Sequence, residues 1–211
     1  MKKIMFNDRF GLTEAVLAGR KTMTRRPTEI LKGMNPDNAC DPIMGIDNRG
    51  RVYFTFTTRF GQTDVYPHFQ IGEEIAIAQS YESIGLSFIS PPDTQWGCTE
   101  QMRGYRNKLF VRADLMPHRI KITNIKVERL QDISEEDAMR EGIYKNPNPP
   151  RWREYDPYEA WHPSAKPFKY TVVKDYCKAR FAFADLINRV SGSGTWESNP
   201  WVFAYEFELI K

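Results

Sequence analysis

The chain has 211 residues, of which 41% are hydrophobic and 13% aromatic, and this composition excludes a disordered protein. It is long enough for one sizeable domain, and its formal net charge of +3 is too small to indicate a partner by itself. We expect a cytoplasmic protein, because the sequence shows neither the apolar run of a signal peptide nor the roughly 20 apolar residues of a membrane helix.

Cysteine and histidine residues are few and scattered, which argues against a metal centre or a disulfide framework. They form no CxxC pair and no other spacing typical of zinc ligands, so we expect reduced thiols and no metal or organic cofactor. The residues concerned are Cys40, Cys98, Cys177, His68, His118 and His162.

Alternating apolar residues predict that strands dominate the chain. Strands are expected at residues 1–6, 21–27, 51–60, 75–77, 108–115, 118–130 and 201–210, with the third in a hairpin that follows the turn residues DNRG. The closing strand WVFAYEFELI places its aromatic residues on one face, and we expect that face to be buried. These residues are Trp201, Phe203, Tyr205 and Phe207.

Two of the predicted helices flank these strands. The segment TEAVLAG, residues 13–19, predicts a short helix with Thr13 as its N-cap and Gly19 at its end. Residues 172–190 carry apolar side chains at helical spacing. Between the strands and this last helix, residues 145–168 are rich in proline and aromatic residues and predict a long ordered loop, which suggests a binding role.

The clearest helical signature is DISEEDAMREGI, residues 132–143. Ser134 and Asp137 have the spacing of a capping box, and Gly142 is placed to end the helix. The many strands, few helices and absence of βαβ alternation predict an α+β protein with an antiparallel, barrel-like sheet. We expect a single domain over residues 1–211.

Local charge is more informative than net charge. Residues 1–33 contain eight basic and three acidic residues, and residues 103–121 contain six basic and one acidic residue. Residues 128–142 contain six acidic and two basic residues. Two basic regions fit a nucleic-acid partner, and solvated faces balanced by an acidic helix are the simpler interpretation.

The segment AGRKTMTRRP, residues 18–27, concentrates four cations around two threonines. The proline at its end favours an extended conformation for the residue before it. In an extended segment Thr24 and Arg26 share one face, and Lys21 and Arg25 share the other. The flexible Lys21 side chain can still reach Thr24 if it curls over the strand. Adjacent arginines repel one another without a partner, so this pair predicts an anion-binding surface.

Gly19, Lys21 and Arg26 fit the pattern GxKxxxxR, and QIGEEIAI, VERLQDISEEDAMREGI and NPWVFAYEFELI follow it in order. In these motifs, which span most of the chain, the sequence resembles the ASCH domain of the PUA-like superfamily. The ending WESNPWVFAYEFELI is similar to larger ASCH proteins of phage and prophage origin. The resemblance implies a PUA-like antiparallel β-barrel with short flanking helices and a long inserted loop plus helix. Insertions are then expected near residues 34–66 and 144–190.

One branch of this family, the small N4-acetylcytidine amidohydrolases, resembles the chain at the chemical positions. That branch removes the acetyl group from the exocyclic amine of a modified cytidine, with a proposed Lys, Thr and Glu triad. Its Lys and Thr lie in a GRKTxTxR segment, which GRKTMTRR matches, giving Lys21 and Thr24. Its Glu ends the helix after the long strand, which corresponds to Glu141. The chain is about twice as long as these enzymes, so its substrate can differ.

The chemistry of amide hydrolysis gives these residue types defined roles. Thr24 would be the nucleophile, which needs a base to take its proton and a stabiliser for the oxyanion. Lys21 can be that base if burial or nearby cations lower its pKa. Glu141 acts against this, and if it keeps Lys21 charged, Lys21 becomes the oxyanion partner and Glu141 the base. The sequence leaves both arrangements open.

Other residues are candidates for binding RNA or a modified nucleoside: Arg20, Arg25 and Arg26 on phosphates, and Tyr81 stacked on a base. Tyr81 lies in AQSY, where the larger phage-type relatives commonly read RETW, so their version of the pocket is in doubt here. Two further functions fit the same residues: a non-catalytic RNA-binding module, and a ribonuclease. We expect no membrane and no obligate protein partner.

Overall fold

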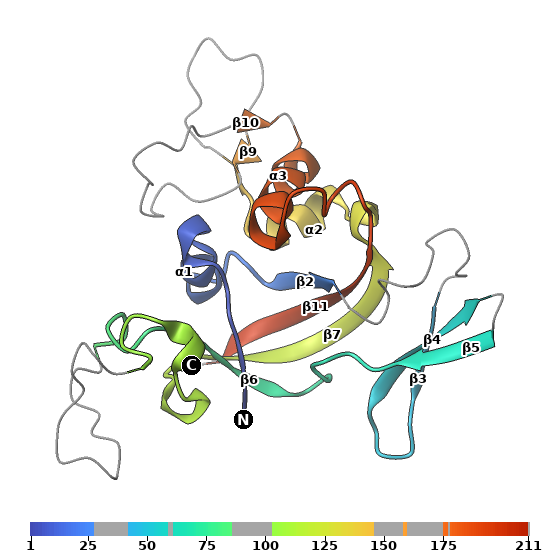
Figure 1. Ribbon diagram of the computed structural model, residues 1–211, viewed down its shortest axis with the longest axis horizontal. Helices are drawn as coiled ribbons and strands as arrows, with labels where there is room; N and C mark the ends of the chain where they lie inside the picture. Colours follow the sequence, from blue (N-terminus) through green and yellow to red (C-terminus); the bar gives the residue numbers. More distant parts are fainter. Residues whose placement is uncertain are drawn as a thin grey trace.

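The computed structural model describes residues 1–27, 42–58, 61–85, 103–145, 158–159, 175–176 and 178–210. Most of the predicted loop over 145–168, with its aromatic residues, lies outside the described residues. The described elements are mostly strands with a few short helices, and they form an α+β fold (Figure 1). No helix among them is long and apolar enough to cross a membrane.

The main sheet has five strands in the order β1-β6-β7-β11-β2. Their bounds are Lys2–Ile4 for β1, Glu74–Ile77 for β6, Arg119–Arg129 for β7, Trp201–Ile210 for β11 and Met23–Pro27 for β2. The pairs are antiparallel except for β1 with β6, which is parallel. The prediction of a purely antiparallel sheet is therefore wrong at this edge.

The expected closed barrel does not appear among the described strands. The two edge strands β1 and β2 pair with one neighbour each, so the sheet remains open between them. A side chain spans this opening instead: the Arg26 guanidinium donates a hydrogen bond of 2.7 Å to the carbonyl of Met5, just beyond β1. We call this opening between β1 and β2 the seam.

Two small sheets accompany the main one. The first contains β3, Ile43–Ile46, β4, Val52–Thr58, and β5, Gly61–Val65, so the predicted hairpin has a third strand. The second contains the two-residue strands β8, Tyr144–Lys145, β9, Tyr158–Glu159, and β10, Asp175–Tyr176. Figure 1 shows β3, β4 and β5 at one end of the main sheet.

Aromatic side chains of β11 form the centre of the core, as the alternation in WVFAYEFELI predicts. Phe203 packs against Phe54 of β4 with ring centroids 5.6 Å apart, and Trp201 packs edge-on against Phe56 at 5.4 Å. The opposite face of β11 is also buried at Ala204, because α2, Glu135–Arg140, lies over it. The two residues paired with Ala204, Arg25 and Lys126, both reach Asp137 of α2.

Among the three α-helices of the described residues, the second and the third begin where a side chain caps the first turn, and the first does not. In α2 the Ser134 hydroxyl accepts a hydrogen bond of 3.0 Å from the Asp137 amide, as the capping-box pattern predicts. The helix α1, Leu12–Leu17, begins after Gly11, and Thr13 lies inside it. Thr13 is therefore not the predicted N-cap, and its hydroxyl instead contacts the Asp8 carboxylate and the carbonyl of Phe6.

The last helix, α3, spans Ala179–Ser191, which is shorter than the predicted segment 172–190 at its start. Residues 175–176 are in strand β10, and the Glu135 carboxylate of α2 accepts a hydrogen bond of 2.7 Å from the Ala179 amide. A carboxylate from a neighbouring helix thus supplies the cap that the local sequence lacks, because Lys178 at the N-cap position has no suitable side chain.

The predicted strand over 108–115 is wrong. This segment forms two turns of 3-10 helix, η4 at Lys108–Phe110 and η5 at Ala113–Leu115. The Asn107 side chain accepts a hydrogen bond from the Leu109 amide, which closes the first turn and competes with an extended conformation. Two further 3-10 turns lie among the described residues, η1 at Asp8–Phe10 and η6 at Leu130–Asp132.

Candidate active site

The segment that carries the lysine and the threonine is positioned by α1 and by the end of α2. Gly19 adopts the left-handed conformation, with φ of +72°, and turns the chain away from α1. The Lys21 amide then donates to the Ala15 carbonyl, and the Thr22 amide donates a hydrogen bond of 2.9 Å to the Arg140 carbonyl. This last bond fixes the start of β2 against the end of α2, where Glu141 follows.

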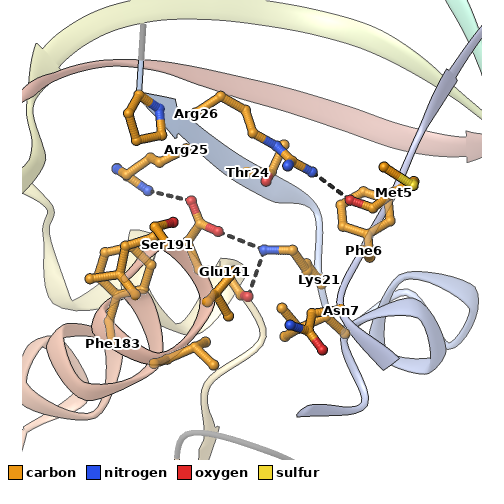
Figure 2. A pocket seen from close by; sticks show the side chains of 15 residues that line it. Met5, Phe6, Asn7, Lys21, Thr24, Arg25, Arg26, Glu141, Phe183 and Ser191 are labelled. Carbon is orange, nitrogen blue, oxygen red and sulfur yellow. Dashed lines mark hydrogen bonds and ion pairs between the residues drawn. The ribbon is translucent and has the colours of Figure 1, made fainter. Parts of the chain in front are cut away.

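Lys21 and Glu141 meet as a buried ion pair, although 120 positions separate them in the chain (Figure 2). The Lys21 Nζ lies 2.6 Å from Glu141 Oε2 and 2.7 Å from the Glu141 carbonyl oxygen. The two side chains are only 3% and 5% exposed. Burial lowers the pKa of Lys21 below its usual range, while Glu141 acts in the opposite direction.

The two acceptors of Glu141 determine how the amine of Lys21 is oriented. A neutral amine has two N–H donors and one lone pair, and an ammonium has three donors. In either form, two positions of the tetrahedral nitrogen are directed to Glu141, and one remains. Since Lys21 lines a pocket, the remaining position can serve a ligand as a lone pair or as an N–H donor. Both roles considered for Lys21 are therefore compatible with one geometry.

Arg25 is held by protein carboxylates and is not available to a phosphate. Its Nη1 lies 3.1 Å from Glu141 Oε1, its Nη2 lies 3.0 Å from Asp137 Oδ2, and its Nε lies 2.7 Å from Glu128 Oε1. The side chain is 0% exposed. Burial alone would lower the pKa of Arg25, but Glu141 and Glu128 raise it above its usual range. The predicted phosphate contact of Arg25 is thus corrected: its anions belong to the protein.

Thr24 and Arg26 face the same pocket as Lys21 and Glu141 (Figure 2). Thr24 is 4% exposed, and its hydroxyl has no hydrogen-bond partner in the described part of the chain. Arg26 donates to the Met5 carbonyl across the seam, and burial lowers its pKa below its usual range. Within the described residues no carboxylate oxygen lies within 4 Å of this guanidinium. Thr24 and Arg26 therefore retain unused hydrogen-bonding groups at the pocket.

The pocket has a cavity volume of about 100 Å³ and lies in the seam, between β2 and the residues that follow β1. Its third wall is α3, which was predicted only as a helix. The lining residues are Met5, Phe6, Asn7, Leu12, Lys21, Thr24, Arg25, Arg26, Pro27, Glu141, Phe183, Leu186, Ile187, Val190 and Ser191. One side of the pocket is thus cationic and the other is apolar.

The predicted site residues do not all gather here. Lys21, Thr24 and Glu141 do, although Thr24 makes no hydrogen bond with either of the other two. Arg20 lies outside the pocket, half exposed, with its Nη2 3.8 Å from Glu14. Tyr81 lies in a separate small core, 5% exposed, and its position does not support stacking on a base.

Burial of Tyr81 has a specific cause. Its hydroxyl accepts a hydrogen bond of 3.0 Å from the Arg112 amide, and its ring packs closely against Gly104. The pocket residues that sequence reasoning missed are the apolar ones of α3. Their helical spacing was visible, but spacing indicates only that a face is buried, and not what it faces.

No group of three or more His, Cys, Asp or Glu side chains suited to a metal ion occurs among the residues that the structure describes. Comparisons with protein-family models, curated proteins and solved structures found no match to this chain.

Proposed function

We propose that this protein is an amidohydrolase of the ASCH type, which hydrolyses the acyl amide on the exocyclic amine of a cytidine-like base. The observation that carries the proposal is the buried Lys21–Glu141 pair beside Thr24 in one pocket. These residue types at these three positions are those that the resemblance to N4-acetylcytidine amidohydrolases implies.

The burial of the pair itself supports a functional role. Removing two charges from water costs several kcal/mol per ion, and apolar residues of similar volume are often as stable. Stability alone therefore gives little reason to keep Lys21 and Glu141 where they are 3% and 5% exposed. Titratable groups with perturbed pKa values in a pocket are more frequent at catalytic sites than elsewhere.

The contacts of Glu141 favour one of the two role assignments. Its Oε2 accepts from Lys21 and its Oε1 accepts from Arg25, so each carboxylate oxygen already accepts a hydrogen bond from the protein, and none of these bonds comes from Thr24. A base for Thr24 needs a free electron pair directed to the hydroxyl. The remaining position on the Lys21 nitrogen meets this requirement more readily, so we assign proton transfer to Lys21 and orientation of Lys21 to Glu141.

The reaction then follows in two halves. The Thr24 hydroxyl oxygen attacks the acyl carbon while its proton passes to neutral Lys21, and the oxyanion is stabilised by the cationic side of the pocket. The carbon–nitrogen bond breaks as Lys21 returns the proton to the leaving amine. Water then attacks the acyl ester on Thr24 and gives a proton to Lys21. The bond between the acyl carbon and the Thr24 oxygen breaks as Lys21 passes this proton to that oxygen, and the released carboxylic acid ionises to a carboxylate.

The proposal is tested with N4-acetylcytidine and purified protein, by following the release of cytidine and acetate. We expect turnover without added metal and no loss with EDTA. Thr24→Ala should abolish turnover. Lys21→Arg should also abolish it, because arginine stays protonated and cannot act as a base. Partial activity in Lys21→Arg would assign Lys21 to the oxyanion instead, and wild-type activity in Thr24→Ala would refute the nucleophile.

A second candidate, RNA binding without catalysis, is favoured by one specific observation. The two basic regions of the sequence lie side by side: Lys3 Nζ donates to the carbonyls of Leu109 and Val111 at 2.7 Å each, and Lys108 Nζ lies 2.8 Å from Asp8. The logarithm of the binding constant for short single-stranded RNA would then fall by ~0.7 for each phosphate contact when the salt concentration rises tenfold. Affinity for RNA that does not depend on salt would remove this candidate.

A further inference from the structure

The pocket presents an unusually large apolar wall for a substrate whose acyl group is a single acetyl. Helix α3 contributes Phe183, Leu186, Ile187 and Val190 to the lining. The first three are 2%, 3% and 7% exposed, whereas Val190 is 38% exposed. In Figure 2 the Phe183 side of the pocket faces Glu141 and Lys21, so the apolar wall stands beside the candidate catalytic groups.

Arg26 gives the same pocket a cation with spare donors. A guanidinium has five N–H donors, and the bond from Nη2 to the Met5 carbonyl uses one of them. Arg26 differs from Arg25, which is balanced by three carboxylates, because it has no carboxylate partner in the described residues. A partly buried guanidinium with no carboxylate in contact is suited to bind an oxygen of a ligand.

We propose that the pocket binds the acyl half of the substrate, with its hydrocarbon chain on α3 and its oxygen on Arg26, and that it prefers acyl groups longer than acetyl. The preference rests on the proposed function, because it concerns the amide that is hydrolysed. Hydrolysis consumes one water and yields an amine and a short-chain carboxylate. That carboxylate combines an apolar chain with an anion, which is the combination that α3 and Arg26 provide.

The first experiment measures binding without catalysis, by calorimetric titration with acetate, propionate, butyrate and isovalerate. We expect affinity to rise about fourfold with each added methylene until the chain fills the pocket. Arg26→Gln should lower butyrate affinity by about tenfold or more, since it removes a charge-assisted hydrogen bond. The matched control is Arg112→Gln, because Arg112 is an exposed arginine paired with Asp114 and does not line the pocket.

The second experiment compares kcat/KM for the N4-acetyl, N4-propionyl and N4-butyryl cytidines. Wild-type protein should favour the longer chains. Val190→Ser, at an exposed position where the change costs little stability, should reduce that preference. Ile187→Phe should shift the preference back to acetyl, because the larger side chain fills part of the pocket. The control is Phe181→Ala, on the exposed side of the same helix and outside the pocket.

The outcomes separate this inference from the function on which it rests. Hydrolysis at equal rates for all three acyl groups, or butyrate affinity unchanged in Arg26→Gln, overturns the acyl-pocket assignment and leaves the amidohydrolase intact. Chain-length-dependent carboxylate binding without hydrolysis of any amide supports the pocket and overturns the amidohydrolase. Carboxylate affinity that is equal for acetate and butyrate counts against the apolar wall directly.

Discussion

Removal of the Glu141 charge should destabilise the protein far more than the loss of an ordinary ion pair. Glu141→Leu leaves Lys21 with an unpaired charge in a site where its side chain is 3% exposed. Breaking a buried pair in this way costs about 3–5 kcal/mol in the free energy of unfolding. For a chain of this size, the midpoint of thermal unfolding should fall by about 6–20 °C.

The double variant Lys21→Met with Glu141→Leu should recover most of that loss. It removes both charges, and Arg25 keeps its contacts with Asp137 and Glu128. Urea unfolding at pH 7 of the wild type, the two single variants and the double variant gives the coupling free energy. A cost under 1 kcal/mol in either single variant, or a loss in the double variant equal to the sum of the two, would contradict a coupled buried pair.

Burial of Lys21 also predicts that the free energy of unfolding depends on pH. Burial lowers the folded-state pKa of Lys21, so between that pKa and the unfolded value of about 10.4 the unfolded chain binds more protons than the folded protein. The contribution of Lys21 to stability is therefore fully present above its pKa in the unfolded chain. It is lost as pH falls through its pKa in the folded protein. The wild-type free energy of unfolding should rise with pH in this window, and Lys21→Met should remove that rise.

Two further predictions concern the fold. Burial raises the pKa of Tyr205 to about 12. The contribution of Tyr205 to the free energy of unfolding is therefore lost as pH rises above about 10, the pKa of tyrosine in the unfolded chain. Absorbance titration should show one tyrosine that ionises later than the others, and Tyr205→Phe should remove that late phase. Phe203→Ala should cost about 3–5 kcal/mol in urea unfolding, because it opens a cavity between β11 and β4, and a loss below 1 kcal/mol would contradict the packing of the β3–β5 sheet on the main sheet.

The parts of the fold that depend on residues close together in the sequence could be predicted. The Ser134 cap and the aromatic face of β11 are examples, because a cap and an alternating strand are encoded within a few positions. The start of α3 could not be predicted, because its cap comes from Glu135, which lies 44 positions away. Local patterns also gave no indication that the sheet would stay open between β1 and β2.

The same distinction applies to the site. Strand alternation placed Arg25 on the face opposite Thr24, but it could not show that three carboxylates already surround that guanidinium. Lys21 and Glu141 were brought together by the resemblance and not by any local pattern, since the contact spans 120 positions. Tyr81 shows the converse error: an aromatic residue after a central strand fits a stacking role and a core role equally, and only packing against Gly104 distinguishes them.

The seam has a consequence for how a ligand reaches the pocket. Strand β2 has a single strand partner, and across the seam it is tied to the residues after β1 by the side chain of Arg26. Displacing the Arg26 side chain breaks this one hydrogen bond, and it leaves in place the backbone ladder of β2 with β11 and the contacts of Arg25 with its three carboxylates. The pocket can therefore open toward the seam through a local fluctuation of one side chain, at a small fraction of the free energy of global unfolding.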